Sequence, residues 1–294
     1  MDGIISIRKP RGPTSHDVVR AVRRLVPGTK VGHAGTLDPA ADGVVVVCLG
    51  AYTRLAALFQ ATPKEYEGVV LFGRSTDTLD LQGRTILRCY VPEDLPQRVA
   101  AALPAFCGGY LQEVPRYSAA KHGGVAFHRL VRKGMETPLR RKWVELHRAE
   151  VLPDCRSRRR IRFKLVTGSG FYVRAWAKDL GDALGIPALL ARLTRTRVGS
   201  YRMETSVALE ELERGSLARH ILRDAAAIPW VPVVNADDDA FDRLCHGQAQ
   251  ELPGERCGET AAVVNESGCL GLIAHAQGSV LQPWIVLKTT GLAP

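Results

Sequence analysis

A twelve-residue segment near the N-terminus restricts the backbone of this chain more than any other part of it. The segment runs from Gly32 to Gly43, reads GHAGTLDPAADG, and contains three glycines and one proline. Glycine permits positive φ and close approach of other atoms, and Pro39 restrains Asp38 to an extended conformation. An isolated Asp-Pro pair most often caps a turn. Here the glycines and the proline together predict a shaped loop that holds the carboxylate of Asp38 between two structured elements.

The rest of the chain mixes strand and helix patterns without regular alternation. Apolar or alternating runs predict strands at Ile4–Ile7, Val44–Leu49, Glu67–Phe72 and Ile161–Leu165. Helical spacing predicts helices from Thr14-Ser15 to Pro27-Gly28, over Pro92–Phe106, and from Tyr172 to Leu184 with Gly185 as the stop. This order favours an α+β fold with a mainly antiparallel mixed sheet and flanking helices.

The composition changes near the C-terminus. The chain has 294 residues, a length that favours one large domain and one small one. After about Pro229 the apolar runs become short and β-like, and they are separated by glycines. We therefore expect a domain of residues 1–229 and a small β-rich domain of residues 230–294.

Charge is distributed unevenly between these two parts. The net charge is +10, and the segment Trp230–Pro294 has eight acidic and three basic residues, so its own charge is −5 and the first 229 residues carry +15. Six of the nine residues from Arg156 to Lys164 are basic. A solvated arginine-rich surface is one explanation. A face that binds a polyanion such as nucleic acid is the explanation we favour.

Several classes of protein are disfavoured by what the sequence lacks. There is no run of eighteen apolar residues and no apolar signal core at the N-terminus, so we expect a cytoplasmic protein without a membrane span. The seven cysteines are scattered, and none forms a CxxC pair. Neither a disulfide framework nor a zinc site is expected from such spacing.

The segment GHAGTLDPAADG is similar to the catalytic loop of tRNA pseudouridine synthases of the TruB type. Five further segments resemble motifs of that family and occur in the family's order. They are Ile7–Ser15 (KPxGxTS), Lys64–Tyr66 (KxY), Thr76–Gly83 (TDTxDxxG), Pro115–Lys121 (PxYSAxK) and Gly168–Arg174, the segment with the family's tyrosine and arginine. One short match would mean little, but six in order, from about residue 4 to residue 200, identify the chain as resembling this family.

The resemblance implies a fold and a reaction. The fold would be the pseudouridine synthase fold followed by a small PUA-like domain, which the segment 230–294 resembles only loosely. The reaction would convert uridine 55 in the T arm of tRNA to pseudouridine. The N1–C1′ bond breaks, the uracil rotates, and the base rejoins the sugar through C5. Nothing is oxidised or hydrolysed, so no cofactor or metal is expected.

The same resemblance assigns the chemistry to Asp38. A carboxylate is useful here because it can attack the sugar or assist proton removal beside C1′, and these two roles stay open. The resemblance pairs Asp38 with Arg174, a cation that would keep the acid ionised. Asp80 matches a second acid that helps to hold this arginine. We therefore expect a network of Asp38, Arg174 and Asp80.

Five further residues are implied to contact the extruded base. Tyr66 would stack on the base and assist the proton at C5, and Tyr172 would be a second aromatic in the pocket. His33 would fill the space that the base leaves in the RNA. Lys9 and Leu193 would line the pocket floor, although support of the loop fits these two equally well. Without the resemblance, two tyrosines on strands would more simply be core residues.

The chain departs from the family pattern at Asp42, where a threonine often precedes the glycine.

Three alternatives also remain: the catalytic subunit of a guide-RNA pseudouridylation complex, a tRNA-binding folding factor, and a hydrolase that uses Asp38. A hydrolase needs a second carboxylate or a metal cluster at suitable spacing, and the sequence offers neither. We favour the stand-alone bacterial type, acting on tRNA as a monomer without an obligate protein partner.

Overall fold

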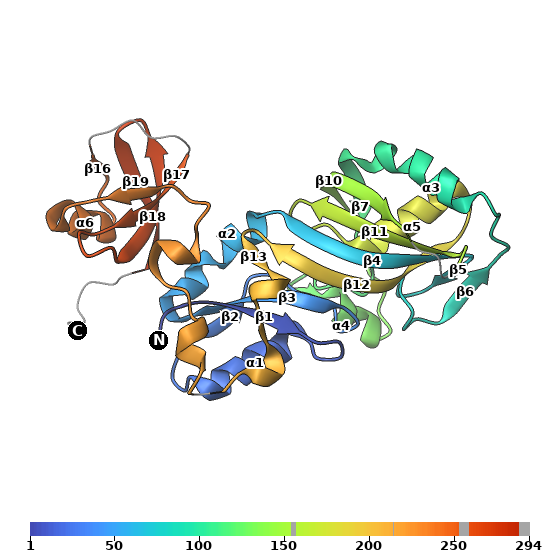
Figure 1. Ribbon diagram of the computed structural model, residues 1–294, viewed down its shortest axis with the longest axis horizontal. Helices are drawn as coiled ribbons and strands as arrows, with labels where there is room; N and C mark the ends of the chain where they lie inside the picture. The colour runs from blue at the N-terminus through green and yellow to red at the C-terminus, as the bar shows by residue number, and fades with distance from the viewer. Residues whose placement is uncertain (154–156, 214, 253–258, 288–294) are drawn as a thin grey trace.

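The fold is built on two β-sheets, one large and one small, which lie at opposite ends of an elongated molecule (Figure 1). This computed structural model describes residues 1–153, 157–213, 215–252 and 259–287. Parts of two sequence features lie outside these ranges, namely Arg156 in the basic run and the cysteines at positions 155 and 257.

The large sheet has ten strands. Along its main path they are β14 (Val207–Ala208), β1 (Gly3–Lys9), β3 (Asp42–Leu49), β12 (Ala188–Val198), β4 (Lys64–Phe72), β11 (Arg160–Thr167), β10 (Arg141–Leu152) and β7 (Gly108–Glu113). Two short strands lie off the path, β2 (Val31–His33) on β3 and β13 (Tyr201–Arg202) on β12. Only the pairs β1–β14 and β3–β12 are parallel in this sheet. The expected α+β fold with a mainly antiparallel mixed sheet is confirmed.

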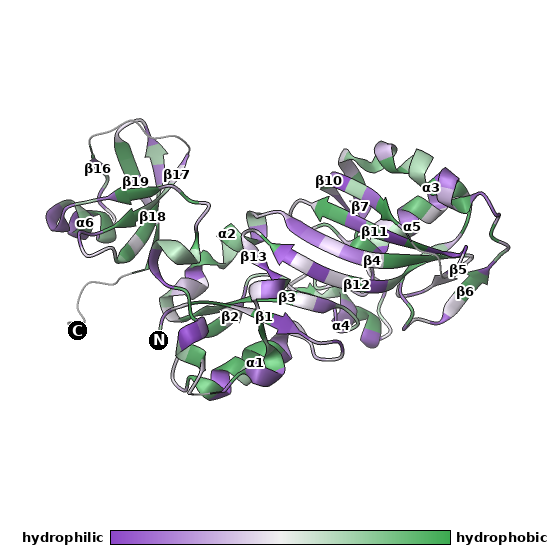
Figure 2. Ribbon diagram, in the orientation of Figure 1, coloured by the Kyte–Doolittle hydropathy of each residue, from purple (hydrophilic) through white to green (hydrophobic). Residues whose placement is uncertain are grey.

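The helices cover the faces of this sheet and the end of the small one. They are α1 (Ser15–Leu25), α2 (Ala56–Ala61), α3 (Leu95–Ala102), α4 (Phe127–Arg132), α5 (Val173–Leu184) and α6 (Asp238–Cys245). Helix α1 begins where its sequence predicts, because Thr14 and Asp17 form a reciprocal capping box. Val18 and Val22 are buried, while hydrophilic residues alternate with them on the outer face (Figure 2).

Helix α5 begins at the end of the segment Gly168–Arg174 and contains Arg174 in its first turn. It packs Trp176 against Phe163 of β11 with ring centroids 4.9 Å apart. It ends at Gly185, whose φ of 66° is the left-handed conformation expected for this cap. Helix α3 differs from its prediction, since it starts at Leu95 instead of Pro92. Its last turn is a 3₁₀ turn that contains Pro104, a residue without the N–H that an α-helix requires.

The small sheet follows the order β15-β17-β18-β19-β16. Its strands are β15 (Val233–Asn235), β16 (Gln250–Glu251), β17 (Thr260–Val264), β18 (Leu270–Gln277) and β19 (Val280–Val286). Two hairpins stand apart from both sheets, β5 (Arg74–Thr76) with β6 (Thr85–Arg88), and β8 (Lys121–His122) with β9 (Val125–Ala126). The expected change to short strands after residue 229 is therefore observed, together with one helix, α6.

Two large hydrophobic clusters stabilise the molecule. One fills the space between the ten-stranded sheet and helices α1, α3 and α5. The other lies on the opposite side of β1 and β3 and includes Ile4 and Val46 from that sheet with Val264 and Ile273 from the small one. Apolar packing thus continues across residue 229, and the division at this point stays a prediction. Among the described helices, none combines the length and apolarity needed to cross a membrane.

Candidate active site

The loop that contains Asp38 is shorter than its sequence suggests. Gly32 and His33 belong to β2, and β3 already begins at Asp42, so residues 34–41 form the loop. Its backbone is fixed by local and distant hydrogen bonds. Ala41 N–H donates to the carbonyl of Asp38, and Gly12 N–H donates to the carbonyl of Pro39 over 2.8 Å. The side chain of Asp38 is 40% exposed at the tip of this loop.

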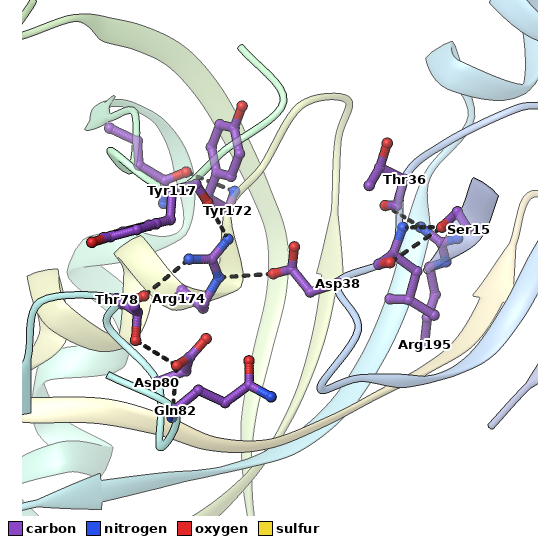
Figure 3. Close-up of polar contacts among 12 residues, drawn as sticks. Ser15, Thr36, Asp38, Thr78, Asp80, Gln82, Tyr117, Tyr172, Arg174 and Arg195 are labelled. Atoms are coloured by element: carbon purple, nitrogen blue, oxygen red, sulfur yellow. Dashed lines mark hydrogen bonds and ion pairs between the residues drawn. The ribbon is translucent and has the colours of Figure 1, made fainter. Parts of the chain in front are cut away.

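Arg174, the second residue of α5, lies directly beside Asp38 (Figure 3). Its Nε donates to Oδ2 of Asp38 over 2.7 Å. Its two terminal nitrogens donate to the backbone carbonyls of Thr78 and Tyr117, each over 2.9 Å. Arg174 is almost fully buried, so all sides of its guanidinium group meet protein acceptors. The expected pair of Asp38 with a buried arginine is therefore present in the structure.

The side chain of Asp80 bonds to its neighbours in the chain and not to Arg174. Among the described residues, Asp80 forms no ion pair with Arg174; its Oδ1 instead accepts from Thr78 Oγ1 over 2.6 Å and from Gln82 N–H over 2.9 Å. These bonds fix a turn in which Leu79 has a φ of 64°, an uncommon value for a leucine. The turn aims the Thr78 carbonyl at Arg174. Asp80 is thus linked to the arginine through Thr78, and its part in a network with Asp38 and Arg174 stays a prediction.

A cavity of about 720 Å³ opens beside Asp38. The loop 34–38, the turn 168–170, the segment 118–121 and parts of β4 and β12 form its walls. Six of the eight residues that the sequence assigned to the site line it, namely His33, Asp38, Tyr66, Tyr172, Arg174 and Leu193. Asp80 lines a second, smaller pocket. Asp38, Arg174 and Leu193 line both this pocket and the cavity.

Tyr66 and Tyr172 both line the cavity. Tyr66 lies on β4, is 8% exposed, and pairs in register with Leu165 and Arg195. Tyr172 immediately precedes α5, and its N–H donates to Gln112 over 2.8 Å. Burial raises the pKa of the Tyr172 hydroxyl, so this group stays protonated near neutral pH. Both rings therefore offer flat, largely apolar faces beside the carboxylate.

His33 is neutral at ordinary pH. Burial, together with the positive charges of His16 and Arg195, lowers the pKa of its imidazole from 6.5 to about 4. Its Nδ1 accepts from Gly35 N–H over 3.3 Å, which requires the proton to be on the other ring nitrogen. The ring also packs edge-on against His16, with centroids 5.1 Å apart. His33 is the last residue of β2, directly before the loop and five residues before Asp38.

Lys9 lies behind the loop instead of on the cavity floor. It is fully buried, and its ammonium group donates to the carbonyls of Pro10, Pro13 and Ala41 over 2.6–2.9 Å. Burial lowers the pKa of Lys9 to about 8, against the opposing charge of Asp42. The structure therefore gives Lys9 the place of a support for the loop. Leu193 does line the cavity, with 7% of its surface exposed.

Sequence reasoning missed two residues that bind the loop. Ser15 Oγ accepts from Leu37 N–H over 2.9 Å and also bonds to the Leu37 carbonyl. Arg195 is buried on β12 and donates to the carbonyls of Gly35, Thr36 and Val44 (Figure 3). Because their partners are backbone groups, the only signal was that Ser15 lies in the KPxGxTS segment.

Asp42, the departure from the family pattern, has its charge compensated. Its Oδ2 lies 3.3 Å from Nε of Arg11 and 3.8 Å from an Nη of Arg192. Its other oxygen is buried and has no hydrogen-bond partner among the residues that the structure describes. Three nearby cations, Arg11, Arg192 and the buried Lys9, thus compensate the negative charge of Asp42.

This arrangement suits a reaction of an uncharged base and sugar at a fixed carboxylate. The carboxylate of Asp38 lies beside a buried arginine that backbone carbonyls also hold in place, and two tyrosines line the same cavity. Among the described residues, no group of three or more His, Cys, Asp or Glu side chains is placed to bind a metal ion. The catalytic group that the cavity offers beside a bound uridine is the carboxylate of Asp38.

Solved structures define the class of protein. The fold is similar to a structure described as an H/ACA RNP bound to a substrate RNA containing 2′-deoxyuridine, with a TM-score of 0.73, 23% identity, and coverage of 98% of this chain and 85% of that one. A Cbf5-Nop10-Gar1 complex gives a TM-score of 0.72, 24% identity, and coverage of 97% and 85%. At these identities the likeness concerns the fold, which is that of a pseudouridine synthase with a PUA-like second domain.

Sequence comparison then gives the family. Residues 23–173 match the N-terminal domain of the TruB family of pseudouridylate synthases. "tRNA pseudouridine synthase B" of Gloeobacter violaceus is 36% identical over 98% of this chain and 100% of its own length. The protein of the same name from Symbiobacterium thermophilum is 38% identical over 85% and 83%. This chain belongs to the TruB family, and it is therefore an isomerase that makes pseudouridine.

Proposed function

We propose that this protein converts the uridine at position 55 in the T arm of tRNA to pseudouridine, with Asp38 as the catalytic carboxylate. The pairing of the Asp38 carboxylate with Arg174 at the edge of the 720 Å³ cavity is the observation that supports this proposal most directly. Its relatives named tRNA pseudouridine synthase B cover nearly the whole chain, which supports tRNA as the substrate.

In the proposed mechanism the target uridine leaves its stack and enters the cavity. Unstacking costs a few kcal/mol, and contacts between the base and the rings of Tyr66 and Tyr172 offset this cost. His33 lies at the end of β2, directly before the loop, and lines the cavity, and in this proposal it fills the position that the base vacates. A neutral imidazole suits this role, since it can stack among bases without a charge to desolvate.

The bond changes balance without any co-reactant. The N1–C1′ bond breaks while Asp38 attacks C1′ or assists removal of the adjacent proton, and the uracil turns within the cavity. A C5–C1′ bond then forms. As it forms, the Asp38–C1′ bond breaks or, in the other route, the proton taken from beside C1′ is returned. The proton leaves C5 with assistance from the Tyr66 hydroxyl, and N1 gains a proton. Arg174 binds the Asp38 carboxylate and holds it in orientation throughout. Leu193 supports the base from the floor of the cavity, and Lys9 and Asp80 support the loop and the arginine.

We further propose a monomer that acts in the cytoplasm without an obligate protein partner, with residues 1–229 as the catalytic domain and residues 230–294 as the small second domain. One solved structure of similar fold is described as an H/ACA RNP bound to a substrate RNA, and another as a Cbf5-Nop10-Gar1 complex, which makes a guide-dependent enzyme the second candidate. The higher identity to proteins named tRNA pseudouridine synthase B, 36–38% against 23–24%, favours the stand-alone type.

The test uses purified protein and an unmodified tRNA transcript, without guide RNA, cofactor or added metal. We expect pseudouridine at position 55 with the wild type and none with Asp38→Asn. A matched control is Asp182→Asn, since Asp182 is an exposed carboxylate on α5 that pairs with Lys178 away from the cavity. Binding of tRNA without modification by the wild type would contradict the enzyme proposal for this substrate and favour a guide-dependent or folding-factor role.

A further inference from the structure

Arg195 is a buried cation without an acidic partner. It is 3% exposed, and in the described part of the chain it forms no ion pair with an aspartate or glutamate. A buried charge is unfavourable unless polar groups compensate it. Here the compensation comes from three backbone carbonyls, with Nε donating to Val44 over 2.7 Å and the two terminal nitrogens donating to Thr36 and Gly35, each over 3.2 Å.

Two of these carbonyls belong to the loop, between His33 and Asp38. The third, of Val44, belongs to β3, the strand that leaves the loop. The planar guanidinium group of Arg195 therefore joins the first residues of the loop to β3, the strand that follows the loop. Ser15 then binds Leu37, the last residue before Asp38. Every residue from 35 to 37 thus has its carbonyl bound by a side chain from another element.

The backbone of Arg195 is paired with neighbouring strands on both sides. It pairs with Gly43 in the parallel contact between β12 and β3, and with Tyr66 on its other side. A Cβ at position 43 would lie only 2.2 Å from the carbonyl oxygen of Arg195. The arginine is therefore held in the middle of the sheet, so that its side chain acts as a rigid connection between the sheet and the loop.

We propose that Arg195 is a positioning residue that fixes the loop between His33 and Asp38, and so sets the distance of the carboxylate from the extruded uridine. This inference rests on the proposed function. Arg195 also lines the cavity, but all three of its guanidinium nitrogens are bound to carbonyls. Its loss should therefore slow the reaction without weakening the binding of tRNA.

The experiment compares Arg195→Met and Arg195→Lys with Arg197→Met. Arg197 lies two residues further on the same strand and bonds to Glu65 and Gly199, away from the loop. We expect the single-turnover rate of Arg195→Met to fall about 100-fold, as for a displacement of a reacting group by about 1 Å. The Kd for tRNA should stay within about twofold. Arg195→Lys, which keeps the charge but not the three-way geometry, should recover part of the rate.

Hydrogen exchange of the amides of residues 34–41 gives a second readout that does not depend on catalysis. Exchange should become at least tenfold faster in both Arg195 variants and not in Arg197→Met, while the amides of β4 stay protected. An equal rate loss in Arg197→Met, a Kd that weakens as much as the rate falls, or unchanged exchange in the loop would each overturn the proposal. If the wild type leaves tRNA unmodified, the proposed function fails, and the exchange data still decide whether Arg195 fixes the loop.

Discussion

The Nε atom of Arg174 donates a 2.7 Å hydrogen bond to Oδ2 of Asp38, joining a helix to a loop that lies 136 residues earlier in the chain. The other two donors of the guanidinium group bind the carbonyls of Thr78 and Tyr117. The backbone, and not the acid, therefore sets the orientation of the arginine. A cation held in this way is already in place when charge develops at the reacting atoms, so no reorganisation is needed.

Replacing Arg174 by lysine should show the value of this geometry. An ammonium group keeps the charge but cannot reach the acid and both carbonyls in one plane. We expect Arg174→Lys to lower the single-turnover rate of tRNA modification about 100-fold, with little change in the affinity for tRNA. Arg98→Lys is the matched control, because Arg98 forms one bond to the Leu184 carbonyl far from the cavity. A rate within threefold of wild type would show that charge alone is sufficient.

Asp80 should influence the rate through Thr78. Asp80→Ala removes the two bonds that hold the turn around Leu79, where the backbone is strained. The Thr78 carbonyl should then move away from Arg174, and we expect a rate about tenfold lower, equivalent to about 1.4 kcal/mol. Asp77→Ala is a suitable control, since Asp77 accepts from Arg84 N–H in the same turn. Equal effects of the two substitutions would argue against a specific link from Asp80 to Arg174.

The lowered pKa of His33 predicts that the stability of the protein depends on pH. Its pKa is lowered from 6.5 to about 4 in the folded protein, so between these values the unfolded chain binds more protons than the folded one. The free energy of unfolding should therefore fall as the pH decreases from about 6.5 to 4, by up to about 3 kcal/mol, and this contribution should be constant above pH 7. Urea unfolding of wild type and His33→Gln over this range tests it. A difference between the two proteins that does not change with pH would contradict the lowered pKa.

Helix α1 and the main strands were predictable because short-range features determine them. A capping box, a regular apolar face and alternating burial all lie within about ten residues, so a local pattern is enough. The start of α3 and its 3₁₀ end were missed, since the effect of Pro104 on the last turn depends on packing. Five motif residues, Asp38, Tyr66, Tyr172, Arg174 and Leu193, were placed in one site by resemblance, and they do surround one cavity.

The supports of the site could not be read in the same way. Lys9, Ser15 and Arg195 bind backbone carbonyls and an N–H, and such partners are identical at every position of a sequence. The indirect position of Asp80 has the same origin, because it depends on the conformation of a turn. Nor could the apolar cluster that joins the two sheets be foreseen, since it brings together residues more than 200 positions apart, such as Val46 and Ile273.

Gly43 offers a direct test of the contact between β3 and β12. Its φ of 112° is rarely adopted by other residues, and a Cβ there would lie 2.2 Å from the Arg195 carbonyl oxygen. Strain in the backbone and overpacking each cost about 1–3 kcal/mol, so we expect Gly43→Ala to lower the free energy of unfolding by about 2–6 kcal/mol.

Gly28→Ala separates the two causes of that loss. Gly28 also has a positive φ, 76°, but a Cβ at this position would meet nothing within 4 Å. This variant should therefore lose only the backbone contribution, about 1 kcal/mol. Chemical denaturation of both variants measures the difference. If Gly43→Ala is no less stable than Gly28→Ala, the close approach of Arg195 to the start of β3 does not constrain the loop, and the rigidity argued for Asp38 must come from Ser15 and Lys9 instead.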